Sequence, residues 1–161
     1  MKTLYLFDRI SLEMAAGVIE VIQTTVHKQI RVFLSSEGGS LGAGLAIYDA
    51  LRTKDATIIA TGCCESAAML ILQAGKTRLA TPNAYFLVHE VSFDGEPTPD
   101  TDAQTRVLAV KIAETIASKL TPRINITPDT AYKQALNRIL FVPHALNYGL
   151  IDGVYGDEYG K

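Results

Sequence analysis

A cluster of glycines between two apolar runs constrains the fold of this chain more than any other feature. Residues 32–34 predict a buried strand, and residues 45–51 predict the body of a helix. The glycines between these runs are Gly38, Gly39, Gly42 and Gly44. A glycine-rich turn from a strand into a helix presents several backbone N–H groups to whatever approaches it. The stretch therefore predicts a βα unit whose loop binds a phosphate or another oxygen that becomes negative.

Strand-like and helix-like stretches alternate along the rest of the chain. Strands are expected at residues 4–7, 30–34, 57–61, 78–80 and 84–88, with a turn at 81–83. Helices are expected at residues 11–25, up to about 52, at 65–74, at about 101–120 and from 127 onward. Residues 91–102 have the composition of a loop, and residues 148–156 predict a turn and a last strand. This alternation predicts a single α/β domain over residues 1–161 with a mostly parallel sheet built from βα units.

The first helix is expected to begin at Ser11, since serine is a favoured N-cap residue. Its apolar stripe is expected to consist of Leu12, Ala15, Ala16, Ile19 and Ile22.

Composition narrows the class of protein. The 161 residues are 48% hydrophobic and 20% charged, which is typical of a globular domain, and the formal net charge is −2. The basic residues are scattered, so no nucleic-acid groove and no membrane-surface patch is expected. No apolar run has the length of a membrane span, and Asp8 and Arg9 interrupt the first apolar run, so no signal peptide is expected. The sequence predicts a cytoplasmic protein.

Neither a metal site nor a cofactor is expected. Cys63 and Cys64 are adjacent, which disfavours a disulfide between them and leaves two small buried thiols as the simplest interpretation. The three histidines, His27, His89 and His144, lie far apart in the sequence and do not have the spacing of zinc ligands.

Phosphate is the first candidate for the glycine loop. The spacing of Gly38, Gly42 and Gly44 fits the loop of short-chain dehydrogenases. That chemistry needs a lysine four residues after a tyrosine, and no tyrosine in the chain has one. A P-loop is excluded because no Gly-Lys-Ser/Thr ends the run.

An oxyanion is the second candidate. Ser66 lies at a predicted strand-to-helix turn, and His89 follows a predicted strand. Acyl transfer needs a nucleophile, a base and N–H donors aimed at the developing negative charge; Ser66, His89 and the glycine loop are the respective candidates. The third interpretation is purely structural, with glycines that let a helix and a strand pack closely, and spacing alone leaves it open.

Four separated motifs resemble those of the ClpP family, the proteolytic subunits of the self-compartmentalising Clp serine peptidases. They are SSEGGSLGAGLAIYDAL, GCCESAAM, LATPNAYFLVHE and HALNYGLID, and they follow one another in the order of the family. The resemblance covers nearly the whole chain. It implies a ClpP/crotonase-type α/β fold in which residues 101–120 form a projecting "handle" helix.

The resemblance also implies roles for individual residues. Ser66 corresponds to the nucleophile and His89 to the general base, while the backbone N–H groups of Gly39 and Ala67 correspond to the oxyanion hole. The position of the family's catalytic aspartate falls on Asn137, whose amide can accept from the histidine ring but carries no charge. If Asn137 does not pair with His89, Asp100 and Asp102 are the next candidates.

The implied function is a serine endopeptidase that cleaves peptides or unfolded polypeptide inside the chamber of stacked homo-oligomeric rings, with no cofactor. The handle helix is expected to close the rings because it is apolar around much of its girth. The resemblance implies an AAA+ unfoldase as a partner, but the start of the sequence at its first strand, without the family's axial-loop segment, argues against that expectation. Two alternatives remain: a catalytically weak or inactive ring subunit with an assembly role, and a crotonase-type acyl-CoA enzyme.

Overall fold

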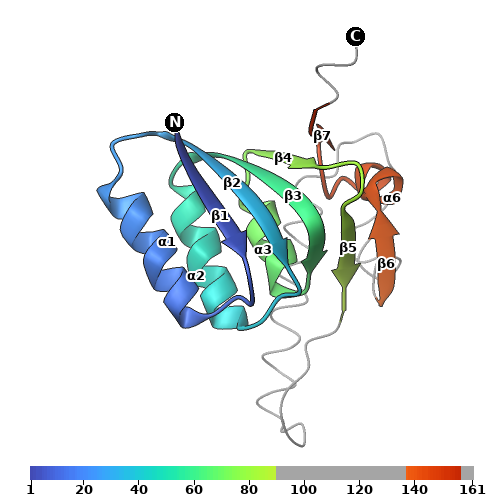
Figure 1. Cartoon of the computed structure of the whole chain (residues 1–161), viewed down its shortest axis with the longest axis horizontal. Coiled ribbons are helices and arrows are strands. Elements are labelled where there is room, and N and C mark those ends of the chain that lie inside the picture. The colour runs from blue at the N-terminus through green and yellow to red at the C-terminus, as the bar shows by residue number, and fades with distance from the viewer. Residues whose placement is uncertain (90–136, 157–161) are drawn as a thin grey trace, which may run out of the picture.

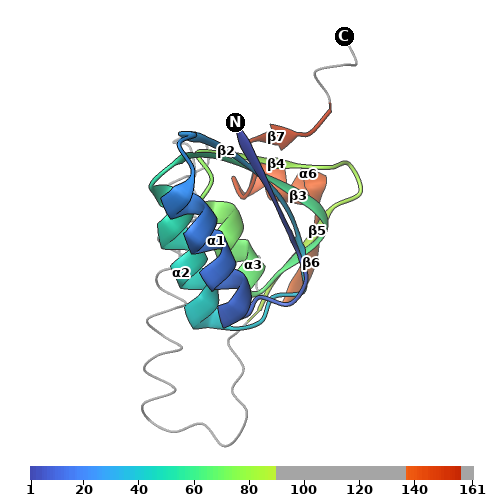
Figure 2. The same cartoon turned by 60° about the vertical axis from the view of Figure 1, so that its left-hand side comes forward.

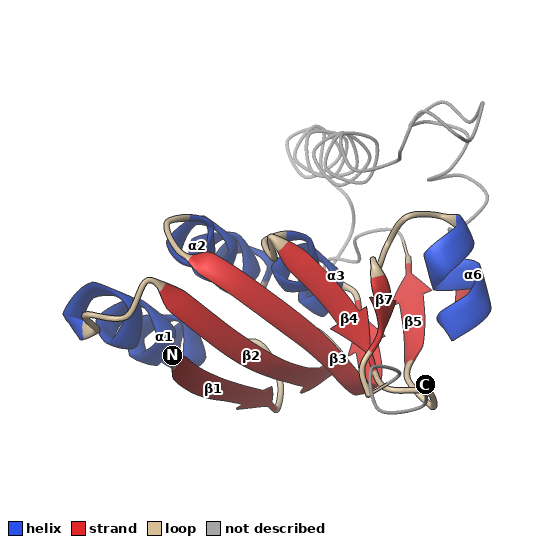
Figure 3. Ribbon diagram, turned by 90° about the horizontal axis from the view of Figure 1, so that it is seen from above, coloured by secondary structure: helices blue, strands red, loops and turns tan. Residues whose placement is uncertain are grey.

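The computed structural model describes residues 1–89 and 137–156, which form a sheet with helices packed on one face (Figure 1). Figures 2 and 3 show the first three helices together on one side of the strands. These helices are α1 (Leu12–Thr24), α2 (Leu41–Arg52) and α3 (Ala67–Gln73). Every residue of α3 is buried, so this helix lies at the centre of the core.

Five parallel strands form the main path of the sheet, in the order β1-β2-β3-β4-β7. They are β1 (Lys2–Phe7), β2 (Gln29–Ser36), β3 (Asp55–Glu65), β4 (Thr77–Ala80) and β7 (Gly153–Val154). Alternate residues of β2 are buried, namely Ile30, Val32 and Leu34, because the helices cover only one face of the sheet. The predicted α/β fold with a mostly parallel sheet is confirmed.

Strand β3 is long enough to pair with two neighbours in succession. Its residues Thr57–Ala60 pair with β4, and its residues Cys63–Glu65 pair with β5 (Tyr85–Val88). Gly62 stands between the two pairings with a φ of 75°, in the left-handed region that favours glycine. Beyond β5 the sheet ends with β6 (Arg138–Phe141), which is antiparallel to β5. We call this change of partner at Gly62 the fork of β3. It takes the end of β3 away from β4 and toward the β5–β6 pair.

Most of the predicted elements are confirmed, and two need correction. The helix expected at residues 65–74 begins only at Ala67, because Glu65 continues β3 and pairs with Leu87. The apolar stripe of α1 was right only in part: Ala15 and Ile22 are buried as expected, but Val18 is buried with them, whereas Leu12 is 73% exposed and Ala16 is exposed as well. The N-cap at Ser11 is confirmed, since its side chain accepts a hydrogen bond from the Met14 N–H at 3.1 Å.

Two elements near the C-terminus were not predicted at all. They are β6 and the short helix α6 (Val142–Asn147), which has a proline in its first turn. Four predicted features lie outside the described residues: the loop at residues 91–102, the handle helix at residues 101–120, the helix from residue 127, and the candidates Asp100 and Asp102. None of the described helices combines the length and hydropathy that a membrane-spanning segment needs.

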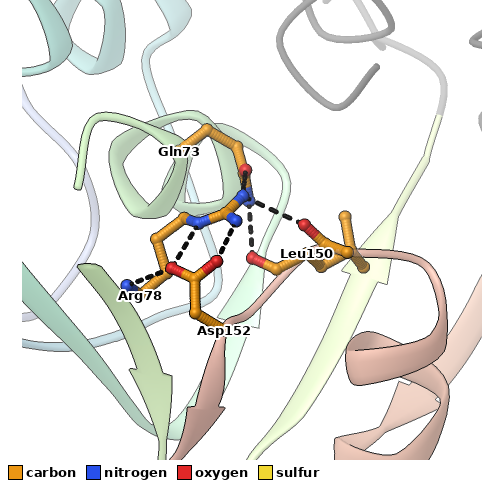
Figure 4. Close-up of polar contacts among 5 residues, drawn as sticks. Gln73, Arg78, Leu150 and Asp152 are labelled. Atoms are coloured by element: carbon orange, nitrogen blue, oxygen red, sulfur yellow. Dashed lines mark hydrogen bonds and ion pairs between the residues drawn. The ribbon is translucent and has the colours of Figure 1, made fainter. Parts of the chain in front are cut away.

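The side chain of Arg78 connects the C-terminal segment, residues 149–154, to the core (Figure 4). Arg78 is 2% exposed, and its guanidinium forms an ion pair with the Asp152 carboxylate, with one contact from Nε at 3.0 Å. Nη1 donates to Gln73 Oε1 at 2.7 Å and to the Gly149 carbonyl at 3.0 Å. Gln73 in turn donates to the Leu150 carbonyl at 3.1 Å. This network joins the end of α3, the start of β4 and the turn before β7.

Candidate active site

Ser66 lies where β3 gives way to α3, at the N-cap position of that helix. Its backbone has φ 53° and ψ −121°, and its side chain makes no capping hydrogen bond. An L residue adopts this conformation only at a cost of about 1–3 kcal/mol, and such strain concentrates at functional sites. Within residues 1–89 and 137–156, Ser66 and Asn137 are the only non-glycine residues with a positive φ. Both are residues to which the resemblance to the ClpP family assigns a catalytic role.

His89 directly follows β5, whose backbone contacts Ser66. The Ser66 N–H donates to the Leu87 carbonyl at 3.0 Å, which extends the β3–β5 pairing by one residue. His89 is half-buried. The structure thus brings the predicted nucleophile and the predicted base to neighbouring strand ends, at the carboxyl edge of the sheet.

Asn137 lies at the start of β6, opposite His89. Its N–H donates to the Val88 carbonyl at 2.6 Å, and the antiparallel register pairs Val88 with Arg138. Extending that register by one residue sets Asn137 across from His89. Its φ of 57° lies in the left-handed region, which asparagine tolerates better than most residues do. The predicted pairing of Asn137 with His89 therefore agrees with the backbone, although it remains a prediction for the side chains.

The glycine loop packs directly against Ser66. A Cβ atom at position 38 would lie 2.7 Å from the Cβ of Ser66, 2.9 Å from the Glu65 carbonyl oxygen and 3.1 Å from the Ala67 nitrogen. Gly38 has a φ of 93°. Only glycine allows the loop and the nucleophile to approach this closely.

The two predicted oxyanion donors, Gly39 and Ala67, flank this contact. Ala67 is the first residue of α3, so its N–H has no acceptor inside the helix. In the described part of the chain, no hydrogen bond uses the N–H of Gly39 or of Ala67. Both N–H groups are therefore available to donate hydrogen bonds to an oxygen that becomes negative beside Ser66.

One glycine of the loop has the purely structural role that the sequence left open. A Cβ atom at Gly44 would lie 3.3 Å from the Cβ of Ala67, so Gly44 allows α2 and α3 to pack closely. The structural interpretation thus holds for Gly44, whereas Gly38 borders the nucleophile itself.

The sheet face opposite the helices is polar around the end of β3. Burial raises the pKa of the Tyr85 hydroxyl, and the neighbouring Cys63 and the hydrogen-bonded Glu65 raise that pKa further. A cavity of about 550 Å³ opens on this side, lined by Phe7, Asp8, Arg9, Ser35, Ser36, Glu37, Gly38, Thr61 and Cys63. Gly38 is the residue that this cavity shares with the surroundings of Ser66. No group of three potential metal ligands occurs among the described residues.

The two cysteines differ in accessibility, which corrects the expectation that both are buried. Cys64 is 0% exposed, and burial raises the pKa of its thiol strongly. Cys63 is half-buried and its Sγ lies 3.8 Å from Ser35 Oγ.

We expect iodoacetamide to modify Cys63 in the native protein and Cys64 only after unfolding, because a buried neutral thiol does not react. Mass spectrometry of the native and the urea-treated protein checks this, and native modification of Cys64 would contradict it.

Gly39→Ala should disrupt the loop severely. Gly39 has a φ of 146°, and a Cβ atom there would lie 2.4 Å from the Ile10 carbonyl oxygen, closer than real Cβ contacts come. We expect a loss of about 3 kcal/mol or more in the free energy of unfolding, measured by urea titration.

Gly42→Ala is the matched control for this substitution. Gly42 belongs to the same sequence motif, yet no atom lies within 4 Å of its Cβ position and it is already helical. This substitution should be neutral or stabilise the protein by up to about 1 kcal/mol. Equal changes in the free energy of unfolding for the two substitutions would contradict the close contact of Gly39 with the Ile10 carbonyl.

The chain is similar to known proteins of one family. The family model described as Clp protease matches residues 2–158. The ATP-dependent Clp protease proteolytic subunit 4, chloroplastic, of Arabidopsis thaliana is 33% identical over 138 residues, which cover 79% of this chain and 45% of that protein. The ATP-dependent Clp protease proteolytic subunit of Deinococcus radiodurans is 31% identical over 135 residues, which cover 80% of this chain and 65% of that protein. The chain thus spans about half to two thirds of the length of these relatives.

Solved structures confirm the predicted ClpP-type fold. The ClpP protease catalytic domain from Plasmodium falciparum has a TM-score of 0.76 at 24% identity and covers 94% of this chain and 83% of its own. ClpP1 from Listeria monocytogenes has a TM-score of 0.75 at 21% identity and covers 98% of this chain and 93% of its own. Together with the family match over residues 2–158, these likenesses lead to one conclusion: the chain belongs to the Clp protease family.

Proposed function

We propose that this protein is a serine endopeptidase that cleaves peptides or unfolded polypeptide. One observation carries the proposal: the loop of Gly38 packs against a strained Ser66, with His89 at the neighbouring strand end. The names of the relatives, which are proteolytic subunits, support the same activity.

The chemistry follows from the placement of these groups. Ser66 Oγ attacks the scissile carbonyl carbon while His89 accepts the hydroxyl proton. The carbonyl oxygen becomes negative and receives hydrogen bonds from the N–H groups of Gly39 and Ala67. His89 then gives the proton to the leaving amine, and an acyl ester remains on Ser66. Water, activated by His89 in the same way, releases the second product and restores the serine.

Asn137 is the residue that separates full activity from weak activity in this proposal. Its amide oxygen can hold the His89 ring by accepting a ring N–H, but it cannot stabilise the imidazolium by charge. The second candidate function, a weak or inactive ring subunit, rests on this one residue. A crotonase-type acyl-CoA enzyme has no need of Ser66 and His89 together, and no observation favours it.

We expect Asn137→Asp to raise kcat for a peptide substrate by about tenfold or more, because a carboxylate stabilises the imidazolium that forms on His89. Aspartate tolerates the positive φ at this position as asparagine does, so the backbone should be retained. Asn147→Asp, at the last residue of α6, is a control that adds the same charge elsewhere. A kcat that stays unchanged or falls in Asn137→Asp would argue against the pairing with His89.

A fluorophosphonate probe tests the proposed function directly, since it reacts only with an activated serine. We expect mass spectrometry to find the probe on Ser66 and on no other serine. An unlabelled protein that assembles normally would favour the inactive ring subunit instead.

We further propose that the chain works as a homo-oligomer of stacked rings, as the word "subunit" in the names of its relatives suggests. The open sheet face supports this, because Tyr5 is 66% exposed and Phe7 55% exposed, and the Tyr5 ring stacks on Phe33 at 5.5 Å. Exposed apolar clusters of this kind commonly mark interfaces. Light scattering at micromolar concentration checks the assembly, and a mass near the 17.4 kDa of one chain would contradict it.

An AAA+ unfoldase remains a candidate partner, since the names of the relatives include "ATP-dependent".

A further inference from the structure

The peptide between Gly38 and Gly39 is held in one orientation by the backbone of Ile10. The Ile10 N–H donates to the Gly38 carbonyl at 2.9 Å, and the Ser40 N–H donates to the Ile10 carbonyl at 2.8 Å. These two bonds form an isolated parallel bridge between Ile10 and Gly39. Ile10 is 1% exposed, so water does not compete for them.

This bridge fixes where the Gly39 N–H points. No cis peptide occurs in the described chain, and in a trans peptide the carbonyl and the following N–H point in opposite directions. The Gly38 carbonyl points toward Ile10, which follows β1. Because β2 lies between β1 and β3, the Gly39 N–H must point toward the side of β3, where Ser66 and Ala67 lie.

The hydroxyl of Ser36 holds the preceding peptide. Ser36 is 3% exposed, and its Oγ accepts the Gly38 N–H at 3.0 Å, with a longer contact of 3.5 Å to the Gly38 carbonyl. Gly38 is thus held at its nitrogen by Ser36 and at its carbonyl by Ile10. Two successive glycines would otherwise allow the peptide between them to flip, since either φ sign is accessible to them. A flipped peptide would present a carbonyl oxygen, not an N–H, to the developing oxyanion.

We propose that Ser36 and the backbone of Ile10 are positioning groups that hold the Gly39 N–H toward the oxyanion before substrate binds. This rests on the proposed peptidase function. In this proposal neither group contacts the substrate, and both act through Gly38, Ser36 at its N–H and Ile10 at its carbonyl. The sequence gives no sign of either role, because Ser36 lies between the expected strand at residues 30–34 and the glycines, and Ile10 lies just before the expected helix at residues 11–25.

The test compares Ser36→Ala with Ser40→Ala in the full chain. Both remove a serine hydroxyl from the same loop, but Ser40 Oγ accepts the Ala43 N–H at the start of α2 and forms no hydrogen bond with Gly38 or Gly39. The Ser40→Ala variant keeps the backbone N–H that donates to the Ile10 carbonyl. Removing an oxyanion donor lowers kcat by about 10²- to 10³-fold, so a donor that is wrongly oriented part of the time should lower kcat by about 10- to 100-fold. We expect that fall in Ser36→Ala with KM within about twofold of the wild-type value. Ser40→Ala should keep kcat within about twofold.

A second measurement separates positioning from general destabilisation. A peptide boronate forms a tetrahedral adduct that uses the oxyanion donors, whereas a peptide of the same sequence with hydrogen in place of the boronate group carries no oxygen to them. Ser36→Ala should weaken boronate inhibition by the same factor as kcat and leave inhibition by this control peptide unchanged. Ser36→Cys, which keeps a weaker acceptor at the same place, should fall between wild type and alanine, and it replaces Ser36→Ala if the alanine variant does not fold.

Different outcomes overturn different statements. If the wild-type protein cleaves peptide but Ser36→Ala has the same kcat, or changes only KM, the positioning role is wrong. The proposed peptidase function is then retained. If the wild-type protein neither cleaves peptide nor takes a fluorophosphonate on Ser66, the peptidase function fails and the positioning role falls with it.

Discussion

Ser66→Ala should abolish peptide cleavage, because removing the nucleophile of a serine peptidase removes the whole acyl-enzyme route. In a complete Ser-His-Asp triad this lowers kcat by about 10⁶-fold, and with Asn137 in place of the aspartate we expect a fall of about 10⁵-fold or less. The fluorophosphonate probe should no longer react. Ser35→Ala is the matched control, since Ser35 is half-buried near the same loop and its hydroxyl forms a hydrogen bond with the Cys63 sulfur, at 3.8 Å, and not with Ser66 or the glycines. It should keep full activity. Probe labelling that persists in Ser66→Ala would place the nucleophile elsewhere.

Ser66→Gly should also be inactive, but it should be more stable than Ser66→Ala. Both variants lack the hydroxyl, and only glycine relieves the strain of a φ of 53°. The strain amounts to about 1–3 kcal/mol, and glycine offsets part of this gain through the larger entropy of its unfolded chain. We therefore expect the glycine variant to be more stable by about 1 kcal/mol in urea unfolding. A glycine variant that is less stable than the alanine variant would show that the backbone at Ser66 is not strained.

Asp152→Ala should have the largest effect on stability of any single change at the C-terminal segment. It leaves the Arg78 guanidinium 2% exposed without its counter-charge, because Gln73 and the Gly149 carbonyl supply only neutral acceptors. Removing one partner of a buried ion pair lowers the free energy of unfolding by about 3–5 kcal/mol. The Asp152 side chain is 41% exposed, so we expect a value near the lower end, about 3 kcal/mol.

Asp55→Ala serves as the control for this effect. Asp55 also pairs with cations, namely Lys76 at 3.1 Å and Lys28 at 3.8 Å, but both lysines are largely exposed. The hydrogen bond from Lys76 is the main cause that lowers the pKa of Asp55 below its usual 3.8. The ion pairs of Asp55 therefore contribute fully to stability above pH 3.8. This contribution is lost as the pH falls through the lower pKa that Asp55 has in the folded protein. At neutral pH the change should be much smaller than that of Asp152→Ala, and equal changes would contradict the special role of the buried arginine.

The same network fixes the far end of α3, the helix that begins after Ser66. Gln73 is its last residue and bonds to both Arg78 and the Leu150 carbonyl. Loss of the network should therefore appear first as local unfolding of the C-terminal segment, which hydrogen exchange of residues 149–154 would detect.

Much of the local structure could be predicted from the sequence. The N-cap at Ser11, the turn after β4 and the strands around the glycine loop follow from residue preferences that act within a few positions. His89 was placed correctly at a strand end, because the apolar run before it ends there, whereas the strand before Ser66 was expected to end at residue 61 and in fact runs to Glu65. The extent of β3 could not be predicted in this way. Glu65 belongs to a strand because it pairs with Leu87, and a polar residue beside a helix-like run carries no sign of that partner.

Only the tertiary structure decided how the parts of the candidate site meet. The fork of β3 at Gly62 turns Ser66 toward β5, and the antiparallel β6 then sets Asn137 across from His89. The orientation of the Gly39 N–H depends on Ile10, and the burial of Arg78 depends on Asp152. Hydrophobic periodicity records which face of an element is buried, and capping residues record where it ends. Neither records which distant element lies beside it, because pairing register is settled by the packing of the whole sheet.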